Sequence, residues 1–192
     1  MFENITNNVS KWITLTDTEK EFFFSVLEFK KVAKKTILLQ EGEICQFEAY
    51  INKGCIRIYY INENGFEVNL QFSVEDWWVS DIASFSEHKP SKLYIETLED
   101  CELLVLTPEK KEILLAEVPK FEKVFRLLVQ RKLSVMQDRL ISTISKTAEE
   151  KYLNFTQLYP TISQRVPQHY IAHYLGISPE FLSKIRTRLA KK

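Results

Sequence analysis

Residues 165–189 read RVPQHYIAHYLGISPEFLSKIRTRL, and Gly176 divides this stretch into two short helical patterns. Ser178 followed by Pro179 is a strong helix start, because a serine hydroxyl caps free backbone amides and proline suits the first helical position. Apolar residues then recur at helical spacing on one face of each half: Ile171, Ala172, Leu175, Leu182, Ile185 and Leu189, with Ile177 at the corner. The stretch therefore predicts a helix-turn-helix, with helices over 167–175 and 179–189.

Basic residues are concentrated at this end of the chain. Residues 161–192 contain one acid, Glu180, against six basic residues, a net charge of +5. The whole chain has 26 basic and 26 acidic residues, so the first 160 residues carry a net charge of −5. Such asymmetry is typical of a polyanion-binding end, and we expect double-stranded DNA as the partner. The six basic residues are Arg165, Lys184, Arg186, Arg188, Lys191 and Lys192.

Composition predicts a cytoplasmic chain without a membrane anchor. No apolar run approaches the roughly 20 residues of a membrane span. Residues 1–15 lack the basic start and apolar middle of a signal peptide. The cysteines Cys45, Cys55 and Cys101 are odd in number and far apart, so we expect buried thiols rather than disulfides or a metal site.

The first half of the chain has the alternating pattern of short strands. A Thr-x-x-Glu capping box, Thr16 and Glu19, predicts a helix over 16–29 before them. Many short strands with regular turns predict a jelly-roll sandwich or barrel that encloses a pocket. The predicted strands are 36–39, 49–52, 55–61, 67–72, 91–98 and 101–106, and Gly42, Gly54 and Gly65 mark turns between them.

After Pro108 the hydrophobic period becomes helical, and one long helix is predicted over 119–146. Such a helix, about 28 residues and about 42 Å long, is longer than a small domain requires. Its apolar stripe could pack partly on the chain's own barrel, and we expect the rest to meet a second copy. The chain is therefore predicted to be a homodimer through Val129, Leu133, Met136, Leu140 and Ile144.

Two stretches resemble the Crp/Fnr family of bacterial transcription regulators, relatives of the cyclic-AMP receptor protein. Residues 166–189 are similar to the family's DNA-reading motif. Residues 34–72 are similar to its effector domain in glycine placement and strand order. The resemblance implies an α+β fold of three parts: a cyclic-nucleotide-binding-like jelly roll (double-stranded β-helix) over 1–118, a dimerisation helix over 119–146 and a helix-turn-helix domain over 147–192. It implies a transcription regulator that binds palindromic operators as a homodimer, with RNA polymerase as a candidate further partner.

The second helix of the motif should present polar side chains to the major groove from its first two turns. Glu180 can accept from a cytosine amino group, and Lys184 can donate to guanine, with Ser183 beside them. The family usually has arginine where Lys184 stands, and a single ammonium cannot bind guanine in a bidentate way, so looser specificity is expected.

Other residues of the motif are expected on the DNA backbone or in the core. Phosphate contacts are predicted for Arg165, Gln168, His169, Arg186 and Arg188. For Arg188 the alternative is a favourable charge at a helix C-terminus. We expect Phe181 in the core rather than on a thymine methyl group. Relatives carry a β-wing after this helix, and the sequence ends at Lys192, so no wing contacts are expected.

The effector pocket departs from its nucleotide-binding relatives. These carry a Gly-Glu-Leu turn whose glutamate holds the ribose, and an arginine that neutralises the cyclic phosphate. Here Ser80, Asp81 and Ser91 stand at the glycine, glutamate and arginine positions, after Trp78. A buried phosphate without a guanidinium would be an unpaired charge. We therefore expect no cyclic-AMP binding, no metal and no other cofactor, while an unidentified small-molecule effector stays open.

Two alternatives of other classes stay open. A cupin-like enzyme or ligand-binding module would use the jelly roll as its site. A cupin-like enzyme needs clustered His and Glu to hold a metal, and His88 is the only histidine in the roll. We therefore expect no enzyme. The other alternative is an interaction module whose helix-turn-helix binds protein, which a weak dependence on salt would reveal.

Overall fold

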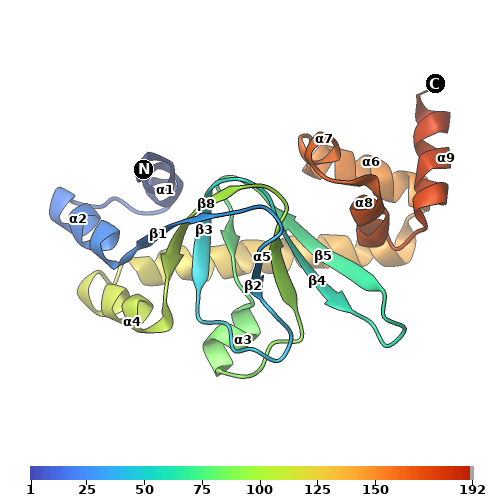
Figure 1. Cartoon of the computed structure of the whole chain (residues 1–192). Helices are drawn as coiled ribbons and strands as arrows, with labels where there is room; N and C mark the ends of the chain where they lie inside the picture. The colour runs from blue at the N-terminus through green and yellow to red at the C-terminus, as the bar shows by residue number, and fades with distance from the viewer. Residues whose placement is uncertain (191–192) are drawn as a thin grey trace.

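The computed structural model describes residues 1–190 and consists of a jelly roll, a long helix and a small helical domain (Figure 1). Its elements are α1 (Glu3–Ser10), α2 (Asp17–Val26), β1 (Glu28–Val32), β2 (Ile37–Leu39), β3 (Glu48–Lys53), β4 (Ile56–Ile61), β5 (Glu67–Ser73), β6 (Trp78–Val79), α3 (Ile82–Glu87), β7 (Tyr94–Thr97), β8 (Cys101–Leu106), α4 (Pro108–Glu117), α5 (Phe121–Ser145), α6 (Ala148–Leu158), α7 (Ile162–Arg165), α8 (Gln168–Leu175) and α9 (Pro179–Leu189). None of these helices is both long and apolar enough to cross a bilayer.

The roll has two antiparallel four-stranded sheets, in the orders β1-β8-β3-β6 and β2-β7-β4-β5. The predicted jelly roll is thereby confirmed. Gly54 shows why its turns need glycine: its φ is +110°, and a Cβ atom there would lie 2.5 Å from the sulfur of Cys101. The predicted helix over 16–29 is wrong at its end, because residues 28–32 form β1, where Glu28 pairs with Val105.

Five helices within residues 1–190 begin at a residue whose side chain caps the first turn: α2, α3, α4, α6 and α9. In α2 the backbone amide of Thr16 donates to Glu19, and the amide of Glu19 donates to the hydroxyl of Thr16. Helix α5 has 25 residues and is about 38 Å long at 1.5 Å per residue. Helices α1, α3 and α7 were not predicted. They are short, at 8, 6 and 4 residues, and contribute few buried apolar residues to a periodic pattern.

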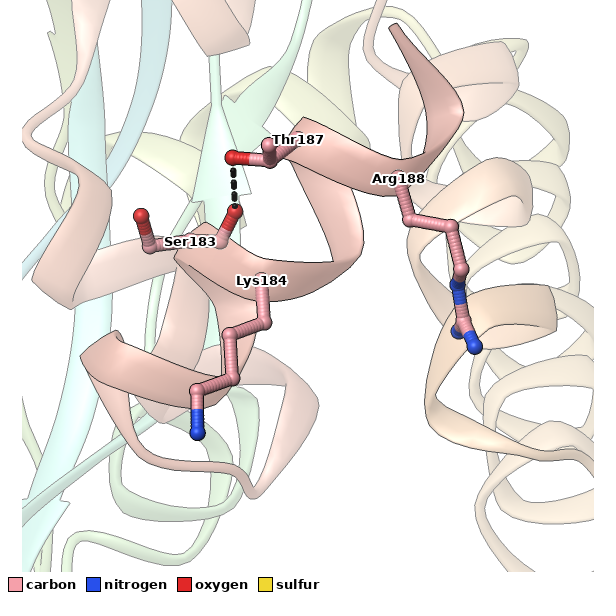
Figure 2. A pocket seen from close by; sticks show the side chains of 4 residues that line it. All are labelled: Ser183, Lys184, Thr187 and Arg188. Carbon is pink, nitrogen blue, oxygen red and sulfur yellow. Dashed lines mark hydrogen bonds between the residues drawn. The ribbon is translucent and has the colours of Figure 1, made fainter. Parts of the chain in front are cut away.

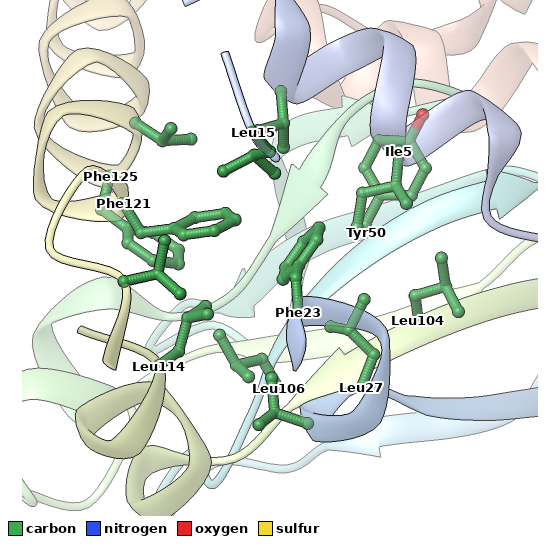
Figure 3. Close-up of a cluster of buried hydrophobic side chains, with 14 of the residues drawn as sticks. Ile5, Leu15, Phe23, Leu27, Tyr50, Leu104, Leu106, Leu114, Phe121 and Phe125 are labelled. Carbon is green, nitrogen blue, oxygen red and sulfur yellow. The ribbon is translucent and has the colours of Figure 1, made fainter. Parts of the chain in front are cut away.

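Three apolar clusters hold these elements together. The first joins α1, α2, α4 and the start of α5 to the outer face of a sheet, with Phe23, Tyr50 and Phe121 among its residues (Figure 3). The second fills the inside of the roll. The third crosses from the roll to the helical domain, since Phe72 of β5 packs with Phe155 and Tyr174. The helix-turn-helix therefore shares its core with the roll instead of forming one of its own.

Candidate nucleic-acid interface and effector pocket

Helices α8 and α9 occupy the ranges that the sequence predicted, apart from the cap residue Pro167. The hydroxyl of Ser178 accepts the backbone amide of Phe181 at 3.2 Å, and Gly176 has the left-handed φ of +70° that the turn needs. Leu182 and Ile185 are buried on one face of α9. The opposite face is left in solvent, so the helix can present side chains outward.

The outward face of α9 carries the three residues predicted to read bases. Glu180, Ser183 and Lys184 are all exposed. Ser183 and Lys184 line a shallow depression of about 390 Å³ together with Thr187 and Arg188 (Figure 2), and Thr187 donates to the carbonyl of Ser183 at 3.0 Å. Among residues 1–190, the side chain of Lys184 has no ion pair or hydrogen bond, so its ammonium is available to a ligand.

Glu180 lies on this outward face at the start of α9, whereas Arg186 lies on a flank of the helix, one turn after the buried Leu182. The pKa of Glu180 is lowered, first by its own backbone amide at the helix start and then by the hydroxyl of Ser178. Glu180 is therefore ionised near neutral pH and can accept hydrogen bonds. Arg186 is exposed and, within the described part of the chain, its guanidinium pairs with no carboxylate.

Phe181 was expected in the core, and this prediction is wrong. Its side chain is 48% exposed at the start of α9. The physical reason is angular: Leu182 and Ile185 already occupy the buried face, and Phe181 precedes Leu182 by about 100° around the helix. An aromatic ring therefore lies next to the polar, outward face of α9.

The prediction that Arg165 contacts a DNA phosphate is corrected, because Arg165 links the helical domain to the roll. It lies in α7 and forms bidentate pairs with two carboxylates of the roll, at 2.8 and 2.9 Å to Glu75 and at 2.9 and 2.6 Å to Glu99. Burial alone would raise the pKa of Glu75, but hydrogen bonds from Arg165 and from the amide of Gly54 outweigh it and lower this pKa. The sequence could not reveal this, because the two carboxylates are 66 and 90 residues away from Arg165.

The other predicted phosphate contacts divide into free and engaged side chains. His169 is exposed, with its ring 4.2 Å from that of Tyr170. Gln168 is half-buried and donates to the carbonyl of Ser163 at 3.3 Å. Arg188 forms an ion pair with Glu149 of α6, so part of its charge is neutralised inside the domain. Lys191 and Lys192, counted in the charge of this end, lie outside the described residues.

The candidate effector residues Asp81 and Ser91 bind each other. The hydroxyl of Ser91 donates to Oδ2 of Asp81 at 2.7 Å, and both side chains are buried. The other carboxylate oxygen of Asp81 caps α3 by accepting the amide of Ser84 at 3.3 Å. Ser80 is buried beside them, 3.6 Å from the sulfur of Cys45. The side chains of Asp81 and Ser91, which the resemblance assigned to the ribose and phosphate positions, thus find their hydrogen-bond partners within the chain.

Trp78 does not join this group. Its ring packs edge-on against Tyr50 at 5.7 Å and against Phe125 at 5.9 Å, in the first apolar cluster. Successive residues of a strand face opposite sides, and Val79 instead enters the cluster inside the roll. The interpretation of Trp78 as an effector contact is therefore corrected to a core position.

Lys132 lies beside this group of residues, and sequence reasoning missed it. It reaches from α5 toward the roll, with its ammonium 3.4 Å from the carbonyl oxygen of Ser80. Burial lowers the pKa of Lys132, while Asp81 and Glu48 act in the opposite direction. Helical spacing could have indicated it, because Lys132 and Arg139 are seven residues apart on the face of α5 that meets the roll.

The apolar stripe of α5 lies on another face of the helix and is uncovered. Its five residues are between 47% and 78% exposed: Val129, Leu133, Met136, Leu140 and Ile144. The alternative that the stripe packs on the chain's own barrel is wrong for these residues, because Lys132 and Arg139 point to the roll instead. A continuous exposed stripe on a 25-residue helix is typical of a protein interface.

Comparison with known proteins finds a family model that matches the roll. Residues 29–117 match the family described as the cyclic nucleotide-binding domain. The chain is 24% identical over 141 residues to the cAMP-activated global transcriptional regulator CRP of Salmonella typhimurium, which covers 73% of this chain and 64% of that protein. It is 22% identical over 125 residues to the protein of the same name from Escherichia coli, covering 65% of this chain and 60% of the relative. The chain thus spans less than two thirds of the length of these relatives.

Solved structures share the fold over most of the chain. FixK2 from Bradyrhizobium japonicum superposes with a TM-score of 0.74 at 16% identity, covering 86% of this chain and 85% of that chain. The c-di-GMP responsive global regulator CLP of Xanthomonas campestris superposes with a TM-score of 0.72 at 14% identity, covering 92% of both chains. At such low identity these likenesses establish the fold alone.

Proposed function

We propose that this chain, a member of the Crp/Fnr family of transcription regulators, is a cytoplasmic homodimer that binds palindromic DNA operators through α9. The observation that carries the proposal is the outward face of α9, where Glu180, Ser183 and Lys184 are exposed while Leu182 and Ile185 are buried on the other side of the helix. We assign the jelly roll to 1–118, the dimerisation helix to 119–146 and the DNA-binding domain to 147–192.

Three residues are proposed to select the half-site sequence. The carboxylate of Glu180 would accept from a cytosine amino group, and the ammonium of Lys184 would donate to guanine O6 or N7. Ser183, one turn along, can donate or accept. Arg186, Arg188 and His169 are proposed as phosphate contacts, which fix the position of the helix but carry no sequence information.

Two copies are proposed to pair along the exposed stripe of α5. A two-fold dimer places two recognition helices about 34 Å apart, one turn of B-form DNA, and each enters one half-site. The stripe supports this geometry because it is separate from the roll-facing residues of α5. Contact with RNA polymerase is a further part of the proposal, which follows from the family's role in transcription.

We propose that the effector pocket does not accept cyclic AMP. A nucleotide phosphate would have to displace the bond between Ser91 and Asp81, and it would meet the uncharged hydroxyl of Ser91 where relatives offer a guanidinium. A cation near that bond is the half-buried Lys132, whose ammonium is 3.4 Å from the Ser80 carbonyl. An effector of other chemistry would act by binding one arrangement of the dimer better than the other.

The proposal is tested by selecting operators from a random duplex pool with the purified protein. Binding to the selected duplex is then measured by fluorescence anisotropy across a series of salt concentrations. We expect enrichment of a palindrome and a linear fall of log K with log salt, because DNA binding releases counterions. No enrichment, or binding that does not depend on salt, would exclude the proposal and favour a protein partner for the helix-turn-helix.

Matched variants in the same assay distinguish residues that recognise bases from residues that do not. Glu180→Ala and Lys184→Ala should relax the selected consensus, since each removes one base contact. Thermal unfolding of both variants should match that of the wild type, because both side chains are exposed. The matched control is Lys92→Ala on an exposed loop of the roll, which should change neither consensus nor affinity.

A further inference from the structure

Arg57 of β4 carries a fully buried charge at the border between the roll and the helix-turn-helix. Its side chain is 2% exposed. Nε donates to Glu96 at 2.8 Å, and Nη2 donates to Glu67 at 3.2 Å, so carboxylates of β7 and β5 neutralise it. Because a buried guanidinium is costly unless every donor is matched, its place in the fold is tightly defined.

The guanidinium of Arg57 is also stacked between two aromatic rings. Tyr59 of the same strand lies 3.8 Å from it, and Tyr170 of α8 lies 3.9 Å from it on the other side. Asn69 of β5 adds a second link, since its amide donates to the carbonyl of Tyr170 at 2.9 Å. Two side chains of the roll thus hold one residue of the helix-turn-helix.

Arg139 of the long helix α5 contacts both the roll and α8, close to the residues just described. Its Nη2 donates to the carbonyl of Asn69 at 2.9 Å and to the carbonyl of Tyr174 at 3.1 Å. Its guanidinium also lies 4.1 Å from the ring of Tyr174. The carbonyl of Tyr174 is in the last turn of α8, where helix carbonyls have no intrahelical partner and attract cations. Arg139 therefore clamps the end of α8 to both the roll and the long helix.

We infer that Arg57 and Arg139 are positioning residues that set the angle between α8–α9 and the long helix α5. This inference rests on the proposed function, because α5 carries the dimer stripe and α9 the reading residues. The apolar cluster beneath them, including Phe72 and Phe155, attaches the domain but is non-directional. The arginine contacts are directional and charge-assisted, so they define one orientation of the helix-turn-helix.

The orientation matters for the spacing of half-sites. Adding one base pair between half-sites moves them about 3.4 Å apart. It also rotates one against the other by about 35°, since a turn has about 10 base pairs. A pair of recognition helices held at one angle to α5 can satisfy only one spacing. If only the apolar cluster held the helix-turn-helix, its orientation could vary, and the pair could also bind half-sites with a slightly shorter or longer spacer. The loss of affinity when the spacer changes therefore measures how firmly the orientation is held.

The test is a series of duplexes with the selected half-sites and spacers changed by one or two base pairs, measured by anisotropy. For the wild type we expect at least about tenfold weaker binding when the spacer changes by one base pair, about 1.4 kcal/mol. For Arg139→Met and Tyr170→Leu, the same change of spacer should weaken binding only about threefold, which is about 0.7 kcal/mol by the same conversion. Arg139→Lys should restore part of the preference, because it keeps the charge but not the forked geometry.

Matched controls exclude a simple loss of charge or of an aromatic ring. Arg131→Met removes one cation from an exposed position of the same helix, and Tyr60→Leu makes the same ring change on exposed β4 surface. Both should leave the spacing profile as in the wild type. If Arg139→Met and Tyr170→Leu lowered stability or affinity while keeping the narrow profile, their role would be structural only, and the inference would be overturned.

A second readout works without DNA, which separates this inference from the proposed function. Hydrogen exchange of backbone amides in residues 168–175 should speed up at least about threefold in Arg139→Met, while β3 and β8 stay unchanged, because α8 opens locally while the roll stays closed. Unchanged exchange in α8 would overturn the inference whatever the DNA result. A wild type that selects no operator, with faster exchange in the variant, would refute the proposed function but keep the orienting contacts.

Discussion

Replacing Leu140 with glutamate should separate the proposed dimer. The five stripe residues are between 47% and 78% exposed in a single copy, so roughly half of each side chain is still available for burial. Fully burying such a side chain contributes about 1.5–3 kcal/mol, so each would add about 1 kcal/mol, and ten of them about 10 kcal/mol. Association itself costs about 4–15 kcal/mol, which leaves a dimer that one charged residue per copy can disrupt.

The magnitude for Leu140→Glu follows from two contributions. The dimer loses the burial of two leucines, about 2 kcal/mol. It also places two carboxylates near the two-fold axis, where desolvation and like-charge repulsion add roughly 2 kcal/mol or more. Together the two contributions are about 4 kcal/mol, which corresponds to about a thousandfold rise in the dimer dissociation constant.

Sedimentation equilibrium over a concentration series measures this dissociation constant. The matched control is Ser134→Glu, which adds the same charge to an exposed position about 120° around α5 from Leu140 and should leave the dimer intact. Thermal unfolding should show that Leu140→Glu still folds, because Leu140 is 60% exposed in the single chain. A Leu140→Glu protein that stayed dimeric at the wild-type constant would refute the assignment of the stripe.

Three further predictions concern the reading helix, the pH dependence and the pocket. Arg186→Ala should weaken all duplexes alike and lower the slope of log K against log salt by about 1, whereas Lys184→Ala should mainly alter base preference; anisotropy on matched and mismatched duplexes distinguishes the two. Burial and then His169 lower the pKa of His173 below 6.5, although Glu67 acts the other way, so the folded state disfavours its protonated form. The free energy of unfolding should therefore decrease as the pH falls through about 6.5, where the unfolded chain begins to bind the proton. Denaturant titrations at several pH values should show that this free energy depends less on pH in His173→Gln. The same pH dependence in the variant as in the wild type would contradict this. Lys132→Met should raise the melting temperature by about 2–4 °C. Burial disfavours the ammonium, and a methionine of similar length removes about 1 kcal/mol of that cost. A lower melting temperature would show that the attraction of the Lys132 ammonium to Asp81 outweighs the cost of burial.

The elements with strong local signals could be predicted from the sequence. Ser178, Pro179 and Gly176 define the bounds of α8 and α9 because capping and left-handed turns depend on neighbouring residues alone. The strands of the roll and the long helix follow from hydrophobic periods of two and of three to four residues. The face of α9 that is free for a ligand follows from the same local pattern.

The roles of individual charged side chains could not be predicted in this way. Arg165, Arg57 and Arg139 look alike in sequence, yet each bonds to groups between 10 and 90 residues away. Phe181 was misplaced for a similar reason, because whether an aromatic side chain at a helix start is buried depends on what packs against that end. The pairing of Ser91 with Asp81 likewise depends on the loop between them.

The sequence by itself determined the bounds of α8 and α9, most strands of the roll, the place of the long helix, and which end carries the positive charge. Only the tertiary structure decided which arginines are free for a ligand and which hold the helix-turn-helix against the roll. The physical reason is range: capping, backbone dihedral preferences and amphipathic periods act over a few residues, whereas the partner of a buried charge is chosen by the packing of segments far apart in the chain.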